Sequence, residues 1–200
     1  YFKPDAGDPA QVMRAIFDAT DMVGEFEKPL YVGYNSEICA HSRSQKTGCS
    51  KCIDNCPAGA ITPNGDIVDV NVDICGGCGN CAAHCPTGAV YYQYPERADH
   101  ISEIQTLARS FLAAGGKAPR LLFIDSEHGM ELITVMARYG DGLPADVIPL
   151  EMHATSGVGH DAMMAALAAG FSQIIILGDP RNAEEYAAVQ NEIELSHAIL

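Results

Sequence analysis

The sequence predicts two small folded units in tandem: an α+β unit organised around two cysteine motifs, and a small three-layer α/β unit with a parallel sheet. All eight cysteines lie between residues 39 and 85. After residue 118, apolar strand-like runs alternate with helical patterns, which is typical of parallel strands joined by crossover helices. The predicted units are an N-terminal helical segment (1–27), the cysteine-rich unit (28–95), a connecting helix (96–118) and the α/β unit (119–200).

The cysteine-rich unit is organised around residues 75–86, whose cysteines follow the spacing C-x2-C-x2-C-x3-C-P. Loops that hold cubane iron–sulfur clusters use this spacing. Gly76, Gly77 and Gly79 permit the tight turns by which closely spaced thiolates surround one cluster, and they let backbone N–H groups approach its sulfurs. We therefore predict an iron–sulfur site at this loop.

A second copy of the motif lies upstream, with its C-x2-C-x3-C-P half at Cys49, Cys52, Cys56 and Pro57. Cys39 is the expected first cysteine of this copy, but residues 40–48 separate it from Cys49 by a longer segment than in the downstream copy. Because the inserted residues are polar and basic, we predict a solvent-exposed loop. Two alternatives stay open here: His41 replaces Cys39 as a ligand, or the first cluster lacks its fourth iron.

Two other uses of the cysteines have to be weighed against clusters. An even number of cysteines is compatible with a disulfide framework. However, close C-x2-C pairs followed by proline suit metal ligation better than disulfide geometry. A zinc ribbon would use two C-x2-C pairs, and it would leave the other cysteines and both Cys-Pro repeats without a role. The pattern therefore favours iron–sulfur clusters.

With these motifs, residues 30–95 resemble a two-cluster bacterial-type ferredoxin that has one lengthened ligand loop. The resemblance implies a ferredoxin-like α+β fold, two [4Fe-4S] clusters, and a crossed ligand set in which the last cysteine of each motif binds the other motif's cluster. Cluster 1 would be bound by Cys39, Cys49, Cys52 and Cys85. Cluster 2 would be bound by Cys75, Cys78, Cys81 and Cys56.

Composition restricts the partners and the location. The formal net charge of −14 argues against nucleic acid and anionic membranes, and it suits docking on basic patches of redox proteins. Residues 163–177 are apolar but too short and too interrupted for a membrane span, so we expect no membrane insertion. Ligand cysteines need a reducing compartment, and no signal peptide is recognised, so a cytoplasmic location is expected.

The elements before residue 119 are predicted from capping and periodicity. Asp8 and Pro9 are typical of a helix start, and apolar residues at helical spacing up to Val23 predict an amphipathic helix that lies on a neighbour. In the cysteine-rich unit we expect a strand at 30–34, a turn and a strand at 62–70, and a closing strand at 89–94 whose tyrosines form a half-buried face. Residues 96–115 form an amphipathic pattern that predicts the connecting helix.

The α/β unit is predicted to alternate strands and helices. Strands are expected at 121–124, 146–152 and 173–177, and helices at 129–139, 161–169 and 183–200. Residues 121–124 are continuously apolar, which is typical of a strand buried on both faces. Pro149 predicts that its strand lies at an edge of the sheet or ends there.

The carboxyl ends of parallel strands are where ligands bind, so polar residues there are candidates for a site. Ser156, Gly157 and Gly159 follow a strand and open a helix, and their N–H groups form a weak candidate anion site. The stretch is not G-x-G-x-x-G, so no dinucleotide site is expected. The polar side chains expected at this edge are Asp125, His128, His153, Ser156 and His160. Without a G-x-S-x-G elbow they do not predict a hydrolase, and no catalytic residue is assigned.

The C-terminal unit carries a second resemblance, in the stretches 155–158, 164–170 and 174–180. Residues 119–200 are similar to the delta subunit of methyl-viologen-reducing hydrogenases, a family that passes electrons to heterodisulfide reductase. That family carries cluster-binding cysteines in these loops, and here Thr155 and Asp179 stand where they would be expected. The resemblance therefore implies a docking or assembly domain that has lost its cluster.

Taken together, these patterns predict an iron–sulfur module that relays single electrons, within a larger assembly of the hydrogenase, formate dehydrogenase or heterodisulfide reductase type. Its expected partners are redox proteins or subunits, and an electron carrier or oxidoreductase subunit is favoured over an independent catalyst. One alternative is a flavin- or substrate-binding oxidoreductase whose C-terminal half carries the active site. Another is a structural iron–sulfur protein for assembly or docking.

Overall fold

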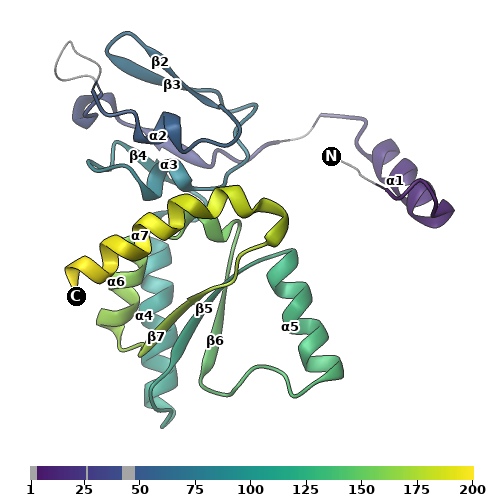
Figure 1. Cartoon of the computed structure of the whole chain (residues 1–200), viewed down its shortest axis with the longest axis vertical. Coiled ribbons are helices and arrows are strands. Elements are labelled where there is room, and N and C mark those ends of the chain that lie inside the picture. The colour runs from purple at the N-terminus through teal and green to yellow at the C-terminus, as the bar shows by residue number, and fades with distance from the viewer. Residues whose placement is uncertain (1–3, 26, 42–47) are drawn as a thin grey trace.

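The computed structural model describes residues 4–25, 27–41 and 48–200. It contains a cysteine-rich region (residues 28–95) packed against an α/β region (residues 97–200), and an N-terminal helix that stands apart from both (Figure 1). Residues 42–47, which make up most of the insertion between Cys39 and Cys49, lie outside the described residues, and so does the loop predicted there.

The N-terminal helix α1 spans Pro9–Asp21. Its predicted start is confirmed, because the Asp8 side chain accepts hydrogen bonds from Ala10 N at 2.9 Å and Gln11 N at 3.3 Å, and Pro9 begins the helix. None of the α1 residues is buried, and Phe17 is 62% exposed. The neighbour that its apolar stripe predicts is therefore not found among the described residues.

Two antiparallel strand pairs frame the cysteine-rich region. Strand β1 (Val32–Tyr34) pairs with β4 (Val90–Tyr92), and β2 (Ile61–Asn64) pairs with β3 (Ile67–Val70). The prediction of one strand in residues 62–70 is corrected, because this stretch lies in a hairpin that turns at Gly65, whose φ is +61°. The described residues of this region also form three short helices: η1 (Ser36–Ile38), α2 (Lys51–Asp54) and α3 (Asn80–Ala83).

The α/β region begins with the long helix α4 (Arg97–Ala113). It continues with strands β5 (Arg120–Asp125), β6 (Val147–Met152) and β7 (Gln173–Ile176), which form a parallel sheet in the order β6-β5-β7. The connecting helices are α5 (His128–Tyr139) and α6 (His160–Ala169), with a short helix η2 (Thr155–Gly157) before α6. The last predicted helix divides into η3 (Pro180–Glu185) and α7 (Tyr186–Ile199).

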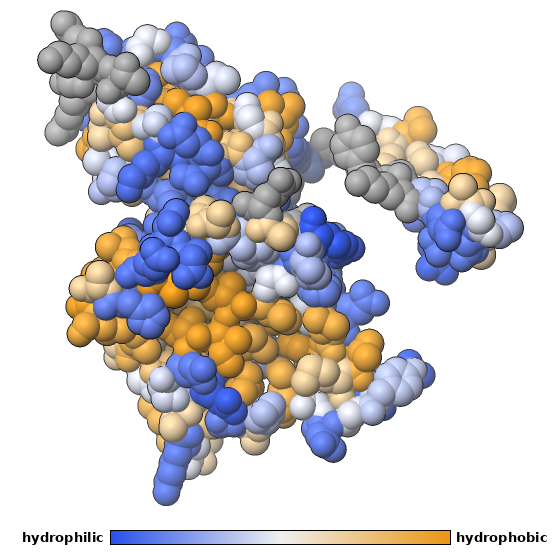
Figure 2. Space-filling view, in the orientation of Figure 1, coloured by the Kyte–Doolittle hydropathy of each residue, from blue (hydrophilic) through white to orange (hydrophobic). Residues whose placement is uncertain are grey.

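Helices cover both faces of this sheet, as the three-layer prediction requires. On one face, Leu121 and Phe123 pack with α4 and α6, and on the other face Ile124 packs with Ile133 of α5. Figure 1 shows α4 and α6 on one side of the sheet and α5 on the other. Strand β5 is fully covered because it is the central strand, whereas β7 is an edge strand. Apolar residues gather on the surface around β7 in Figure 2, where its isoleucines are only half-buried. Within the described residues, no helix is long and apolar enough to cross a membrane.

Helix α7 lies between the sheet and the cysteine-rich region, so it contacts α6 on one side and α3 on the other (Figure 1). The short helix η2 also contacts α3. The cysteine loops therefore lie next to the carboxyl end of β6, where ligands commonly bind in parallel sheets.

Candidate metal centre

All eight cysteines lie within the described chain, and none of them forms a disulfide bond there. A disulfide framework is therefore not formed. Among the described residues, no group of three or more His, Cys, Asp and Glu side chains is arranged to hold a single metal ion.

One cavity of about 450 Å³ is lined by the cysteines predicted for cluster 2. These are Cys56, Cys75, Cys78 and Cys81. Cys56 belongs to the upstream motif, but the fold places it at the cavity that is lined by three cysteines of the downstream motif.

The loop around this cavity depends on glycine. Gly77 and Gly79 have φ values of +75° and +80°, a left-handed conformation that side chains rarely adopt. A Cβ on Gly77 would lie 2.6 Å from the Tyr31 ring, and one on Gly79 would lie 3.0 Å from the Cα of Gly157. The sequence prediction that these glycines permit the tight loop therefore has a geometric reason.

The cysteines predicted for cluster 1 also approach one another. Burial raises the pKa of Cys52 to about 11, and the neighbouring thiols of Cys85, Cys49 and Cys39 act in the same direction. Cys39 is 6% exposed and directly follows η1. The Nδ1 of His41 donates a hydrogen bond to the backbone oxygen of Cys49 at 2.8 Å, so the imidazole is held beside the ligand loop by its backbone.

Backbone N–H groups point at the sulfurs of the last cysteine in each motif. Ala60 N donates to Cys56 Sγ at 3.2 Å, and Val90 N donates to Cys85 Sγ at 3.4 Å. Burial opposes ionisation of Cys85, but the N–H groups around its sulfur outweigh burial and lower its pKa. These donors stabilise a thiolate, which is the form that binds metal.

Two other cluster-2 thiols, those of Cys78 and Cys81, lie where burial disfavours ionisation. Burial raises the pKa of Cys78 to about 11, and burial raises the pKa of Cys81 further. Deep thiols of this kind ionise when they bind a metal, which supplies the missing positive charge. A cavity of this size, four thiols around it and N–H donors at a sulfur together fit an iron–sulfur cluster.

A comparison with known protein families gives the type of domain that the cysteine-rich region contains. Residues 47–99 match the 4Fe-4S dicluster domain. This part of the chain is an iron–sulfur, ferredoxin-like domain. The match includes every predicted ligand of the ferredoxin-like domain except Cys39, which precedes it. Comparisons with curated proteins and with solved structures found no match.

The weak anion-site candidates have other roles in the structure. The buried Ser156 Oγ lies 3.3 Å from the Cys78 oxygen and 3.1 Å from Glu185 Oε2. A Cβ on Gly157 would lie 2.7 Å from the same Cys78 oxygen, so this glycine allows close backbone contact with the ferredoxin-like domain. Gly159 is the N-cap of α6.

The N-terminus of α6 is occupied by a carboxylate of the protein itself. The N–H of His160 donates to Glu192 Oε2 at 3.0 Å, and its Nδ1 lies 2.6 Å from the same oxygen. The helix end therefore already has the negative charge that such a position favours.

The polar residues expected together at the sheet edge do not converge. His153 stacks on Tyr31 and donates from Nε2 to the Gly76 oxygen at 3.0 Å, whereas His160 binds Glu192. Asp125 accepts hydrogen bonds from the backbone N–H groups of residues 127 and 129, which start α5. The prediction that these side chains cluster at the sheet edge is therefore corrected, because each of these three has different contacts.

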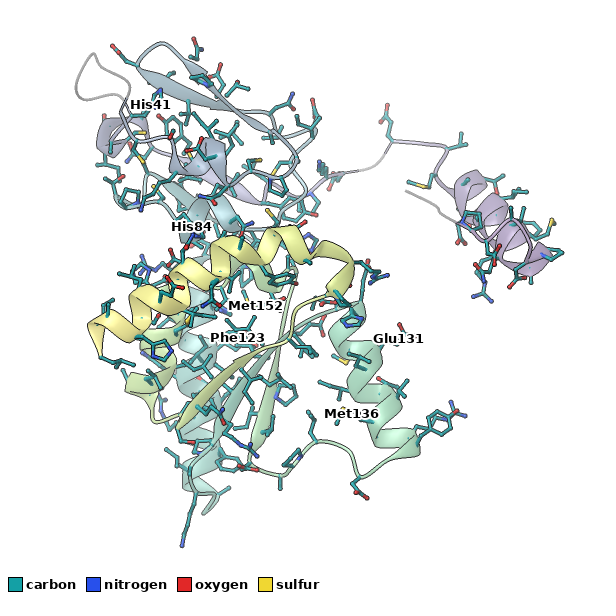
Figure 3. The ribbon with its side chains drawn as sticks, in the orientation of Figure 1. His41, His84, Phe123, Glu131, Met136 and Met152 are labelled. Atoms are coloured by element: carbon teal, nitrogen blue, oxygen red, sulfur yellow. The ribbon has the colours of Figure 1, made fainter. Side chains whose placement is uncertain are left out.

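Sequence reasoning missed an interface that joins α7 to the ferredoxin-like domain at His84, labelled in Figure 3. His84 Nδ1 lies 2.9 Å from the Asn80 oxygen, and Nε2 lies 2.9 Å from the Ala188 oxygen. One acceptor is a backbone carbonyl of α3 and the other is a backbone carbonyl of α7, so the imidazole ring joins the two helices. The Glu192 carboxylate lies 3.5 Å away and is also buried. The available signal was a glutamate at helical spacing between Val189 and Ser196 on the buried face of α7.

A second cavity, of about 460 Å³, lies between the ferredoxin-like domain and the α/β region. It is lined by Cys78 and Cys85, which are predicted ligands of different clusters, and by aromatic and apolar side chains that include Tyr92 and Met152. His100 also lines it, and its buried Nε2 has no hydrogen-bond partner among the described residues.

Proposed function

We propose that this chain relays single electrons through two [4Fe-4S] clusters held by the crossed ligand set, as a module of a larger oxidoreductase assembly. The strongest support is the cavity lined by Cys56 together with Cys75, Cys78 and Cys81, because Cys56 comes from the other motif. When bound, such clusters supply one-electron redox chemistry over a wide range of potentials.

The residues of the chain prepare this chemistry in three ways. The thiolates bind, the N–H groups of Ala60 and Val90 stabilise sulfur charge, and an apolar core excludes water. That core includes Val68 and Val90 together with Cys52 and Cys81, one ligand of each predicted cluster. A shared core keeps the two sites close, which suits electron transfer between them.

For the α/β region we propose a docking or assembly role related to that of the hydrogenase delta subunit. The two positions aligned with that family's cysteines are close together, which supports the resemblance. Thr155 Oγ1 lies 3.0 Å from the Tyr186 hydroxyl, and Asp179 N donates to the same oxygen at 3.0 Å. One tyrosine thus links the two positions where the family would hold a cluster.

Metal analysis of anaerobically purified protein tests the proposed relay. We expect about eight irons and eight acid-labile sulfides per chain, with magnetically coupled EPR signals on reduction. About seven irons with a signal in the oxidised state would show that Cys39 does not complete the first cluster. Zinc in place of iron, or clusters that cannot be reduced reversibly, would contradict the proposal and favour a structural role.

A second candidate function, a flavin-dependent oxidoreductase, is favoured by the cavity between the regions. Its volume of about 460 Å³ is within the range of small-molecule sites. An occupant would contact the loops of Cys78 and Cys85, so it would lie beside both predicted clusters. His100 Nε2, which has no hydrogen-bond partner among the residues that the structure describes, would form a hydrogen bond with a heteroatom of the occupant.

Titration of the holoprotein with FMN tests this second function through quenching of flavin fluorescence. If it is correct, His100→Phe should weaken binding by about tenfold, because one buried hydrogen bond is lost. Phenylalanine preserves the ring that packs on Phe123. His197→Phe, at an exposed position of α7, is the control and should leave affinity unchanged. Absence of flavin binding, or equal effects of the two substitutions, would leave the relay as the function.

A further inference from the structure

The α/β region makes direct contact with the loop that carries three cluster-2 ligands. His153 Nε2 donates to the Gly76 oxygen at 3.0 Å, and Ser156 Oγ lies 3.3 Å from the Cys78 oxygen. A Cβ on Gly157 would clash with the Cys78 oxygen at 2.7 Å, so the two backbones touch here. Residues 153–157 therefore form one side of the cluster-2 environment.

A carboxylate accompanies this contact. Glu185 lines the cluster-2 cavity together with Ala154, and its Oε2 lies 3.1 Å from Ser156 Oγ. Ser156 is itself buried and lies between Glu185 and the Cys78 oxygen, so it links the carboxylate to the ligand loop. Glu185 also directly precedes α7, where the positive end of the helix dipole favours a negative charge.

The charge of Glu185 is not balanced by an ion pair in the described part of the chain. Next to Cys85, a predicted ligand of cluster 1, the situation is different. There the buried Glu192 carboxylate has two histidine partners: its Oε1 lies 3.5 Å from His84 Nε2, and its Oε2 lies 2.6 Å from His160 Nδ1. Of these two carboxylates, Glu185 is therefore the one that lines the cluster-2 cavity and has no ion-pair partner in the described part of the chain.

We propose that Glu185, held in place by Ser156, lowers the reduction potential of cluster 2 relative to cluster 1. Reduction adds one electron from an external donor, and therefore one negative charge, so a fixed carboxylate beside the cavity disfavours it. At equilibrium a single electron would then reside mainly on cluster 1. This inference rests on the proposed electron relay, and it gives the α/β region a role in setting the direction of flow.

An EPR-monitored redox titration of the full chain with both clusters tests the inference. Glu185→Gln should raise the potential of cluster 2 alone, changing the distribution of an electron between the clusters by about tenfold, which is about 59 mV for a one-electron couple. The cluster-2 signal is identified as the one that is lost in Cys78→Ala. Glu131→Gln removes the same charge from an exposed position of α5 and should change neither potential (Figure 3).

Ser156→Ala tests whether the serine positions Glu185. It should raise the same potential by less than Glu185→Gln does, and it should have no further effect in the Glu185→Gln background. An effect of Ser156→Ala that persists in that background would contradict the positioning role.

The two proposals fail in different ways. If iron content and reversible reduction are normal but Glu185→Gln moves neither potential, or moves both equally, this inference is wrong and the relay stands. If the wild-type chain holds no reducible clusters, the relay itself is wrong.

Discussion

Replacing Cys85 with alanine is expected to abolish cluster 1 and leave cluster 2, although Cys85 lies in the same motif as three predicted ligands of cluster 2. Alanine carries no donor atom, so the site of Cys49 and Cys52 would lack its fourth thiolate. Iron should fall from about eight to about four per chain, or to about seven if a three-iron cluster survives. Iron analysis measures the iron content per chain, and EPR of the reduced protein shows which cluster remains. The effect is large because the loss of one ligand side chain removes a whole cluster.

Two reference variants make the assignment unambiguous. Cys49→Ala removes a ligand that belongs to cluster 1 in any scheme, and Cys78→Ala does the same for cluster 2. Crossing predicts that Cys85→Ala gives the spectrum of Cys49→Ala, and that Cys56→Ala gives the spectrum of Cys78→Ala. The reverse correspondence would show that each motif binds its own cluster, and it would contradict the ligand set that the cavity around Cys56 supports.

The cluster loops could be predicted from sequence because their information is local. Cysteine spacing and glycine position determine how a short loop turns, and the structure gives Gly77 and Gly79 the left-handed conformations that this loop needs. The crossing is different, because it depends on how two distant motifs pack together. Spacing alone is equally compatible with crossed and uncrossed ligands, so only the resemblance to a two-cluster ferredoxin suggested the pairing.

The strands show the same division between local and tertiary information. Residues 121–124 and 173–177 are similarly apolar, yet β5 is central and fully covered while β7 is a half-buried edge strand. Strand order depends on crossover topology, which local composition does not encode. Strand β2 contains Pro63, and proline argues against a strand. The exception is a position where no neighbouring strand would accept a hydrogen bond from the N–H group that proline lacks. Here β2 pairs with β3 alone, so its other edge is free to accept proline.

The contacts between the regions could not be predicted because they join residues far apart in the chain. Glu192 and His84 illustrate this. The sequence around each residue is typical of an ordinary helix, and the two side chains come into contact only because α7 packs on α3. A glutamate on the apolar face of a helix is nevertheless a usable signal. Charged residues are almost never buried unless they are paired, so such a position predicts a buried partner even when the partner cannot be named.

Truncating Glu192 to alanine is expected to lower the free energy of unfolding by about 3–5 kcal/mol, because it breaks the buried pair that the carboxylate forms with His84. It also removes the acceptor of two His160 hydrogen bonds. For a chain of this length, the thermal midpoint of the holoprotein should fall by about 10 °C. Calorimetry measures the shift, and iron content shows whether the clusters are retained.

An exposed ion pair provides the matched control for this loss. The Arg97–Asp161 pair is close, at 2.7 Å, but the Arg97 side chain is 65% exposed, so Arg97→Gln should cost less than about 1 kcal/mol. If the buried contact between His84 and Glu192 is what matters, His84→Phe should be less harmful in the Glu192→Ala background than alone, because that contact has already been lost there. Independent, additive effects of the two substitutions would show that packing, and not the buried ion pair, joins the α/β region to the ferredoxin-like domain.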